Sequence, residues 1–145
     1  MIKYVKGDLF SVKSGIIAHG VNTKGAFGSG IAYVMSVTYP EVRERYLEKH
    51  SKNGWQLADV QVVDLNNGLF IANCATQDDY GLGQVHANYE AIRVCMEKLK
   101  RLAKMRNLTI SIPRIGAGLA GGSWATIEQI LKEVFDDHDV IVYTL

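Results

Sequence analysis

The sequence predicts an α/β fold, a three-layer α/β/α sandwich with a mixed, mostly parallel sheet. Short apolar runs of strand length alternate with segments of helical periodicity. At the C-terminal end, a strand–helix–strand order implies a parallel pair joined by a right-handed crossover. The segment 108–112 is mainly apolar and has no charged residue, which favours a sheet covered on both faces. With 145 residues, the chain suits one domain over 1–145.

The first half of the chain predicts two strands, a glycine-rich loop and a broken helix. The runs "IKYV" and "GIIAHGV" (15–21) have the length of strands, and "NTKGAFGSG" separates the second run from the helix. Apolar residues recur at spacings of three or four between Ile31 and His50, as a helix requires. Pro40 falls inside this pattern, so we expect two helical pieces.

The second half predicts a hairpin followed by alternating helices and strands. Asn66-Asn67-Gly68 is a turn signal between two apolar runs, which indicates antiparallel strands. Ser123 is a candidate N-cap for the last helix. The expected elements are strands over 59–65 and 68–75, a helix over 84–104, a strand over 108–112, a helix over 124–134 and a strand over 139–145.

Composition excludes several classes of function. Sixteen Lys and Arg against 15 Asp and Glu leave a net charge of +1, so bulk charge favours neither nucleic acid nor an anionic membrane. Cys74 and Cys95 stand in apolar contexts without a Cys/His cluster, which predicts buried free thiols and no metal site. The sequence has no signal-peptide pattern and no long apolar run, and we expect a cytoplasmic protein that spans no membrane.

Two glycine clusters each follow an apolar strand and precede a helix. They are Gly25, Gly28 and Gly30 in the first loop, and Gly116, Gly118 and Gly121 in the second. Helix N-termini attract phosphate, and glycines let the backbone approach a ligand closely. Two such loops at the carboxyl ends of strands can clamp a pyrophosphate between them. The alternative interpretation is that these glycines only form tight turns.

The second loop also matches the G-x-G-x-x-G pattern of dinucleotide-binding Rossmann domains. That fold needs an acidic residue at the end of the next strand to hold the ribose hydroxyls. Here Asp136, Asp137 and Asp139 precede the next strand instead of following it. The NAD-binding interpretation therefore fails on position.

Four blocks of the sequence resemble the macrodomain family. They are "YVKGDLF" (4–10), "IIAHGVNTKGAFGSGIA" (16–32), "PRIGAGLAGGSW" (113–124) and "VYTL" (142–145). The branch most similar contains the terminal ADP-ribose protein glycohydrolase and the fungal ADP-ribose 1''-phosphate phosphatase. The resemblance implies ADP-ribose or a derivative as the ligand, ADP-ribosylated macromolecules as further partners, and no cofactor.

The resemblance also implies roles for individual residues. Asp8 matches the acid that accepts a hydrogen bond from the adenine amino group; a turn or N-cap role is its alternative. Leu9 and Leu145 match positions beside the adenosine, and plain core packing is the alternative for both. Asn22 matches an asparagine that contacts the distal ribose. The phosphate loops correspond to Gly28, Ser29, Gly30 and Ile31, and to Arg114, Ile115, Gly116, Ala117, Gly118, Leu119 and Ala120; Arg114 is either a phosphate contact or a surface salt-bridge partner.

The chain departs from the glycohydrolase pattern at two positions. The segment "ANCATQDDYG" (72–81) lacks the lysine nucleophile of that enzyme, and Ala120 stands where it has an aspartate. Without the amine, the covalent lysine route is not available.

Three other residues are candidates for catalysis: His19, Asn22 and Asp79. An imidazole at His19 can exchange a proton or position water, although a histidine at a strand end is often structural. Either Asp78 or Asp79 can orient water at the distal ribose, or both can simply form a solvated turn, and Tyr80 with Gly81 can cap that ribose.

We therefore expect an ADP-ribose-binding hydrolase that converts ADP-ribose 1''-phosphate to ADP-ribose and phosphate. The alternatives are a non-catalytic ADP-ribose-binding module, and a hydrolase of O-acyl-ADP-ribose or ADP-ribosyl groups that uses water.

Overall fold

The computed structural model describes residues 1–80, 85–118 and 120–145. A six-stranded sheet of order β1-β6-β5-β2-β4-β3 forms its centre, and every neighbouring pair is parallel except β3 with β4. The elements are β1 (Ile2–Lys6), the short 3-10 helix η1 (Leu9–Ser11), β2 (Gly15–Asn22), α1 (Gly30–Thr38), α2 (Pro40–Lys52), β3 (Val60–Asp64), β4 (Leu69–Gln77), α3 (Tyr89–Arg106), β5 (Ile110–Ile112), α4 (Trp124–Val134) and β6 (Val140–Thr144).

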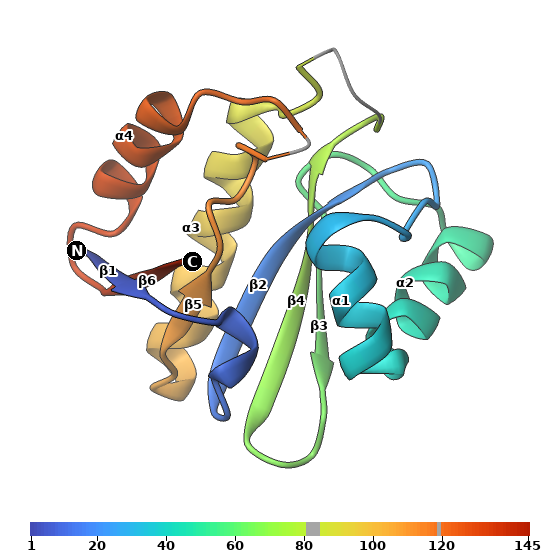
Figure 1. Cartoon of the computed structure of the whole chain (residues 1–145), viewed down its shortest axis with the longest axis horizontal. Helices are drawn as coiled ribbons and strands as arrows, with labels where there is room; N and C mark the ends of the chain where they lie inside the picture. Colours follow the sequence, from blue (N-terminus) through green and yellow to red (C-terminus); the bar gives the residue numbers. More distant parts are fainter. Residues whose placement is uncertain (81–84, 119) are drawn as a thin grey trace.

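The helices form layers on both sides of the sheet, which confirms the predicted sandwich. Figure 1 shows α1 and α2 together on one side and α3 and α4 on the other. Alternate residues of β2 enter the two cores: Ile16 packs with the α3 and α4 side chains, and Ile17 with those of α1 and α2. A strand with helices on both faces must be apolar on both faces, which explains the continuous hydrophobic run that the sequence shows.

The predicted turn and helix break are confirmed. β3 and β4 pair in antiparallel register with Asp64 opposite Phe70, and both Asn66 and Gly68 adopt positive φ in the turn. Pro40 is the first residue of α2, where its missing N–H leaves no helical hydrogen bond unmade. The Ser123 side chain caps α4 by accepting a hydrogen bond from the Thr126 N–H.

The boundaries of α3 and β5 differ from the prediction. Residues 85–88 precede the helix, which begins at Tyr89 and continues to Arg106; Gln84 lies outside the described residues. Asn88 is extended, and its side chain accepts a hydrogen bond from the Ala91 N–H at 2.9 Å. Ala87 fits the helical spacing but pairs with Gln77 as an isolated bridge. β5 covers only three residues of the expected five.

Replacing the α3 N-cap tests this boundary. We expect Asn88→Ala to lower the free energy of unfolding by about 1 kcal/mol, because the first turn of α3 loses its side-chain acceptor. Asn88→Ser keeps an acceptor and should stay within about 0.5 kcal/mol of the wild type. Urea unfolding followed by circular dichroism measures both; equal losses in the two variants would contradict the capping role.

The topology gathers the functional segments at one edge of the sheet. β1, β6, β5, β2 and β4 run in the same direction, so their carboxyl ends lie together. The segments at this edge are Gly7-Asp8, Leu145, the loop after β5, the loop after β2 and the residues after β4. Ligands of open α/β sheets bind at this edge. Among the helices of the described residues, none is long and apolar enough to cross a membrane.

Candidate functional site

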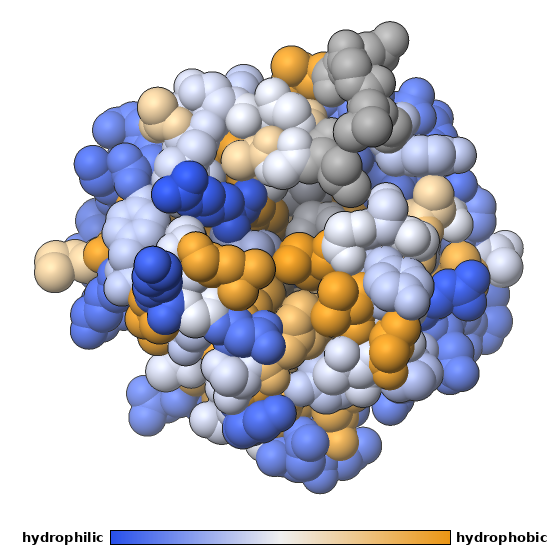
Figure 2. Space-filling view, viewed as in Figure 1, coloured by the Kyte–Doolittle hydropathy of each residue, from blue (hydrophilic) through white to orange (hydrophobic). Residues whose placement is uncertain are grey.

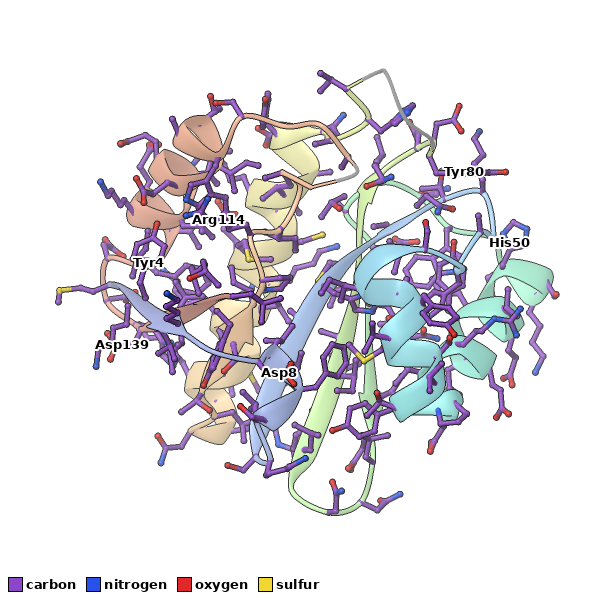
Figure 3. The ribbon with its side chains drawn as sticks, viewed as in Figure 1. Tyr4, Asp8, His50, Tyr80, Arg114 and Asp139 are labelled. Atoms are coloured by element: carbon purple, nitrogen blue, oxygen red, sulfur yellow. The ribbon has the colours of Figure 1, made fainter. Side chains whose placement is uncertain are left out.

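A cleft with two lobes lies at the carboxyl edge of the sheet. The first lobe has a volume of about 820 Å³ and the second about 580 Å³, and Ile31, Pro113 and Arg114 line both. The lobes are therefore neighbours along one cleft, which has the size of a small-molecule site. Apolar side chains gather in the middle of the face shown in Figure 2, with polar residues around them. Asp8 and Arg114 lie on this face in Figure 3.

The amide of Asn22 shapes the first glycine loop. Its Oδ1 accepts hydrogen bonds from the N–H groups of Lys24 at 3.0 Å and Ala26 at 3.2 Å, and its Nδ2 donates to the Ala26 carbonyl at 2.7 Å. The Tyr46 hydroxyl lies 3.0 Å from the same Oδ1. Asn22 lines the first lobe, and its partners among the described residues leave one Nδ2 hydrogen of the amide for a ligand. The contact of Asn22 with a distal ribose and its catalytic role stay predictions.

The N-terminus of α1 faces the first lobe. Gly28, Ser29, Gly30 and Ile31 all line this lobe, as the sequence predicted for a ligand loop. Ser29 is the N-cap, and its side chain makes no capping hydrogen bond within the described part of the chain. The first N–H groups of a helix have no partner inside the helix, and they favour an anion. This end of α1 is therefore suited to a phosphate.

The second glycine loop forms the opposite wall of the first lobe. Ile115, Gly116, Ala117, Gly118 and Ala120 line it; Leu119 lies outside the described residues. The Gly116 carbonyl accepts a hydrogen bond from the Gly122 N–H at 2.8 Å, which closes the loop on itself. The Ala120 carbonyl accepts from the N–H groups of His86 and Ala87, which ties the loop to the segment before α3.

Arg114 lies between the two lobes. Its guanidinium stands 5.7 Å from the centre of the Trp124 ring, and Figure 3 shows it on the same side of the cleft as Tyr4. Arg114 makes no ion pair with any residue in 1–80, 85–118 or 120–145, so its salt-bridge alternative finds no support there. The charge is therefore available to an anion in the cleft.

The second lobe is apolar with one carboxylate. Leu9, which is buried, and Leu145, which is exposed, both line it together with Asp8. The Oδ1 of Asp8 accepts a hydrogen bond from the Phe10 N–H at 2.9 Å and so caps η1. Its second carboxylate oxygen is left to accept a hydrogen bond from a ligand. An apolar lobe with a single acceptor fits a nucleobase that carries an amino group.

His19 is buried at the floor of the first lobe. Only 1% of its surface is exposed, and its Nε2 lies 2.5 Å from Asn73 Oδ1. The Asn73 amide nitrogen donates to the Gln61 side chain at 3.1 Å, so the Asn73 oxygen accepts and His19 carries its proton on Nε2. Nδ1 is then a bare acceptor, and it has no partner among the described residues. Burial lowers the pKa of His19 to about 4.

This low pKa predicts how stability depends on pH. Unfolded His19 takes a proton below about pH 6.5, whereas the folded protein keeps it neutral until about pH 4. The contribution of a neutral His19 is complete above pH 6.5 and is lost as the pH falls from 6.5 to 4. The wild type should lose about 3 kcal/mol more than His19→Gln over this range, given the fall of the pKa from 6.5 to about 4. Urea unfolding at several pH values measures this difference, and parallel curves would contradict it.

The two aspartates after β4 form a turn. Asp78 Oδ1 accepts a hydrogen bond from the Thr23 hydroxyl at 2.9 Å, and Asp79 Oδ1 accepts from the Tyr80 N–H at 2.8 Å. Neither residue is among the described residues that line the cleft. One oxygen of the Asp79 carboxylate is used locally, and its catalytic role stays a prediction. Tyr80 does line the first lobe, and Figure 3 shows it beyond the end of β4; Gly81 lies outside the described residues.

Gln77 is a site residue that the sequence reasoning missed. It lines the first lobe and lies opposite Asn22 across the β2–β4 pair. The register shifts between Val21 and Asn22, so β4 contains an extra residue just before Gln77. Such bulges redirect side chains beside functional sites. Its Nε2 donates to the Asp79 carbonyl at 2.6 Å. The sequence signal that could have identified Gln77 is its polar side chain at the end of an apolar strand.

The two cysteines are free and buried, as predicted. The contact with the neighbouring Cys95 side chain, toward which the Cys74 thiol donates, together with burial, raises the pKa of the Cys74 thiol. Within the described ranges, no group of three or more His, Cys, Asp or Glu side chains is arranged to hold a metal ion. The candidate site therefore consists of backbone amides, carboxamides, one carboxylate and one arginine.

Together, the fold and the cleft define a class: an α/β/α sandwich with a site for an anionic nucleotide-like ligand between two glycine loops. Residues 18–131 match the model of the Macro domain, and the chain belongs to this family. It is 29% identical over 157 residues to the ADP-ribose 1''-phosphate phosphatase of Candida albicans, with 100% of each chain covered. It is 31% identical over 148 residues to human ADP-ribose glycohydrolase OARD1, with 99% of this chain and 91% of that protein covered.

The structure is also similar to solved macrodomains. The macrodomain of Mycobacterium tuberculosis DarG superimposes with a TM-score of 0.86 at 26% identity, with 100% of this chain and 98% of that chain covered. These comparisons confirm the family resemblance and the fold class.

Proposed function

We propose that this chain binds ADP-ribose and hydrolyses a small derivative of it, ADP-ribose 1''-phosphate, to ADP-ribose and phosphate. The observation that carries the proposal is the two-lobed cleft, which has an apolar lobe beside Asp8 at one end and two glycine loops at the other. The two relatives that cover nearly the whole chain are named for reactions of ADP-ribose compounds, which supports this ligand.

Under this proposal, the ligand lies along the cleft with its adenine in the second lobe and its distal ribose in the first. The adenine lies in the second lobe, where Asp8 accepts a hydrogen bond from its amino group and Leu9 and Leu145 cover its faces. The diphosphate crosses at the N-terminus of α1, under Arg114 and against the loop that begins at Gly116. The distal ribose enters the first lobe beside Asn22, Gln77 and Tyr80.

Hydrolysis of the 1''-phosphate uses water as the nucleophile. Water attacks the phosphorus, the bond from phosphorus to the C1'' oxygen breaks, and that oxygen leaves with a proton as the hydroxyl of ADP-ribose. The N–H groups of the two glycine loops stabilise the charge that develops on the phosphoryl oxygens. His19 is neutral at pH 7. Its Nδ1 is buried, so accepting a hydrogen bond from water or a sugar hydroxyl would require the lining of the first lobe to shift when the ligand binds.

A second candidate function is binding without turnover. Ala120 and the absence of a lysine in 72–81 remove the residues of the covalent glycohydrolase route, and Asp79 lies outside the cleft lining. The chain would then recognise free ADP-ribose or ADP-ribosylated macromolecules in the cytoplasm. A third candidate keeps the water-based chemistry and applies it to O-acyl-ADP-ribose or to ADP-ribosyl groups.

Calorimetric titration and a product assay separate these functions. Titration with ADP-ribose tests the ligand, and AMP and ribose 5-phosphate serve as part-ligands that fill one lobe each. Phosphate release from ADP-ribose 1''-phosphate tests the reaction. Binding with phosphate release supports the proposal, and binding without turnover of any of the three substrate types supports the binding module. No binding of ADP-ribose would overturn the assignment of the ligand itself.

A further inference from the structure

The first glycine loop is held from below by a side chain of α2. Tyr46 is fully buried, and its hydroxyl donates a hydrogen bond to the Asn22 carbonyl at 2.7 Å. The same hydroxyl accepts a hydrogen bond from the Gly25 N–H at 3.1 Å. One phenol oxygen therefore joins both ends of the turn 22–25. Tyr46 itself is not among the described residues that line the cleft.

The ring of Tyr46 is fixed in place by its neighbours. The ring centres of Phe27 and Trp55 each lie 5.0 Å from its own. Trp55 also donates from its indole nitrogen to the Tyr46 carbonyl at 3.1 Å, and Lys49 lies over the Trp55 ring. Because the interior is closely packed, the phenol cannot turn away from the loop. The hydroxyl is therefore a fixed point for the loop backbone.

The loop conformation depends on this point. Gly25 has a φ of +86°, and a Cβ built on it would lie 2.8 Å from the His50 ring, so the backbone fits closely between α2 and the loop. Figure 3 shows His50 beside this loop. Beyond it, the chain passes through Ala26 to Gly28 and Ser29, which line the first lobe. A change in the turn 22–25 therefore moves the amides that face the ligand.

We infer that Tyr46 is a positioning residue: its hydroxyl holds the first glycine loop in the shape that binds the ligand, without touching the ligand. This inference rests on the proposed function for the identity of the ligand. It predicts that removing one oxygen atom outside the cleft weakens binding inside it.

The test is Tyr46→Phe, which removes the hydroxyl and keeps the ring. We expect the Kd for ADP-ribose to rise about tenfold, the usual effect of losing one or two buried hydrogen bonds. Tyr33→Phe is the matched control, since Tyr33 is exposed on α1 and lines neither lobe; its Kd should stay within about twofold of the wild type. The KM for the hydrolysed substrate should rise with the Kd, while kcat changes by less than about threefold.

A second variant separates positioning from general stability. Ile71→Val trims a fully buried residue in the same core cluster as Tyr46, away from the loop. It lowers the free energy of unfolding but leaves the loop contacts intact, so the Kd should not change when both proteins are folded. If Ile71→Val and Tyr46→Phe weaken binding in proportion to their lost stability, Tyr46 is merely structural and the inference is overturned.

Amide exchange tests the loop without any ligand. In the wild type, the hydrogen bond to Tyr46 should protect the Gly25 N–H, and in Tyr46→Phe we expect its hydrogen exchange to accelerate at least about tenfold. Tyr33→Phe should leave it unchanged. A Gly25 N–H that is unprotected in the wild type overturns the inference. If the wild type does not bind ADP-ribose, the proposed function fails, whereas normal binding by both Tyr variants overturns only the role of Tyr46.

Discussion

Replacing Gly116 by alanine should lower the free energy of unfolding by about 3 kcal/mol, which is a large share of the stability of a domain of this size. Gly116 has a φ of +79°, which strains any residue with a Cβ. The added Cβ would also lie 2.8 Å from Ile92 Cδ1 and 3.0 Å from Ile127 Cδ1. Both isoleucines are fully buried in the core under α3 and α4, so they have little room to move.

A second glycine of the same loop provides the control. Gly118 has ordinary backbone angles, and a Cβ built on it meets no described atom within 4 Å. Gly118→Ala should therefore stay within about 0.5 kcal/mol of the wild type in urea unfolding. Similar losses of unfolding free energy in both variants would contradict this explanation, because they would show that any alanine in the loop is destabilising, whether or not its Cβ meets the core.

The two glycines explain why the sequence pattern only partly predicts the second loop. Both belong to the same G-x-G motif, which predicted a loop after a strand, and this loop lines the cleft. Both glycines line the first lobe, but only Gly116 also lies against the core, where a Cβ would meet Ile92 and Ile127. That distinction depends on which residues from distant segments lie against each Cα. The motif alone contains no information on this packing.

The predicted catalytic residues show a similar limit. Residue type and position at strand ends correctly placed His19 and Asn22 at the first lobe. Neither property shows that Asn73 from β4 binds the imidazole, or that Lys24, Ala26 and Tyr46 use the Asn22 oxygen. Hydrogen bonds within the fold therefore occupy most of the Asn22 amide and one ring nitrogen of His19. The helical spacing between Ile31 and His50 includes Tyr46, but spacing could not show that its hydroxyl supports a loop.

The local signals that succeeded were those set by backbone chemistry. Asn66-Asn67-Gly68 and Pro40 impose a turn and a helix break through their own φ preferences, and both features appear where expected. The start of α3 was placed too early because apolar spacing ignores the capping side chain of Asn88. Capping residues are visible in the sequence, but an asparagine becomes a cap only when the preceding chain is held extended, here by the bridge from Ala87 to Gln77.

Replacing Asp8, the acceptor in the second lobe, by asparagine should reverse the preference of the protein for adenine over a base that carries an oxygen at the same position. In Asp8→Asn, the side-chain oxygen can still accept from the Phe10 N–H, so η1 keeps its cap. The group left for the ligand then changes from an acceptor oxygen to an amide donor. It would face the amino donor of adenine, and the Kd for ADP-ribose should rise about 10- to 100-fold, the effect of losing a hydrogen bond to a charged group.

The matched ligand is inosine diphosphate ribose, whose base carries an oxygen acceptor where adenine has its amino group. The wild type should bind it more weakly than ADP-ribose, because two acceptors meet at Asp8. Asp8→Asn should bind it more tightly than ADP-ribose, because its new donor finds that oxygen. Calorimetric titration of both proteins with both ligands gives the four Kd values. Equal weakening of the two ligands by Asp8→Asn would contradict a direct contact between Asp8 and the base, since a general loss of loop shape cannot tell the two bases apart.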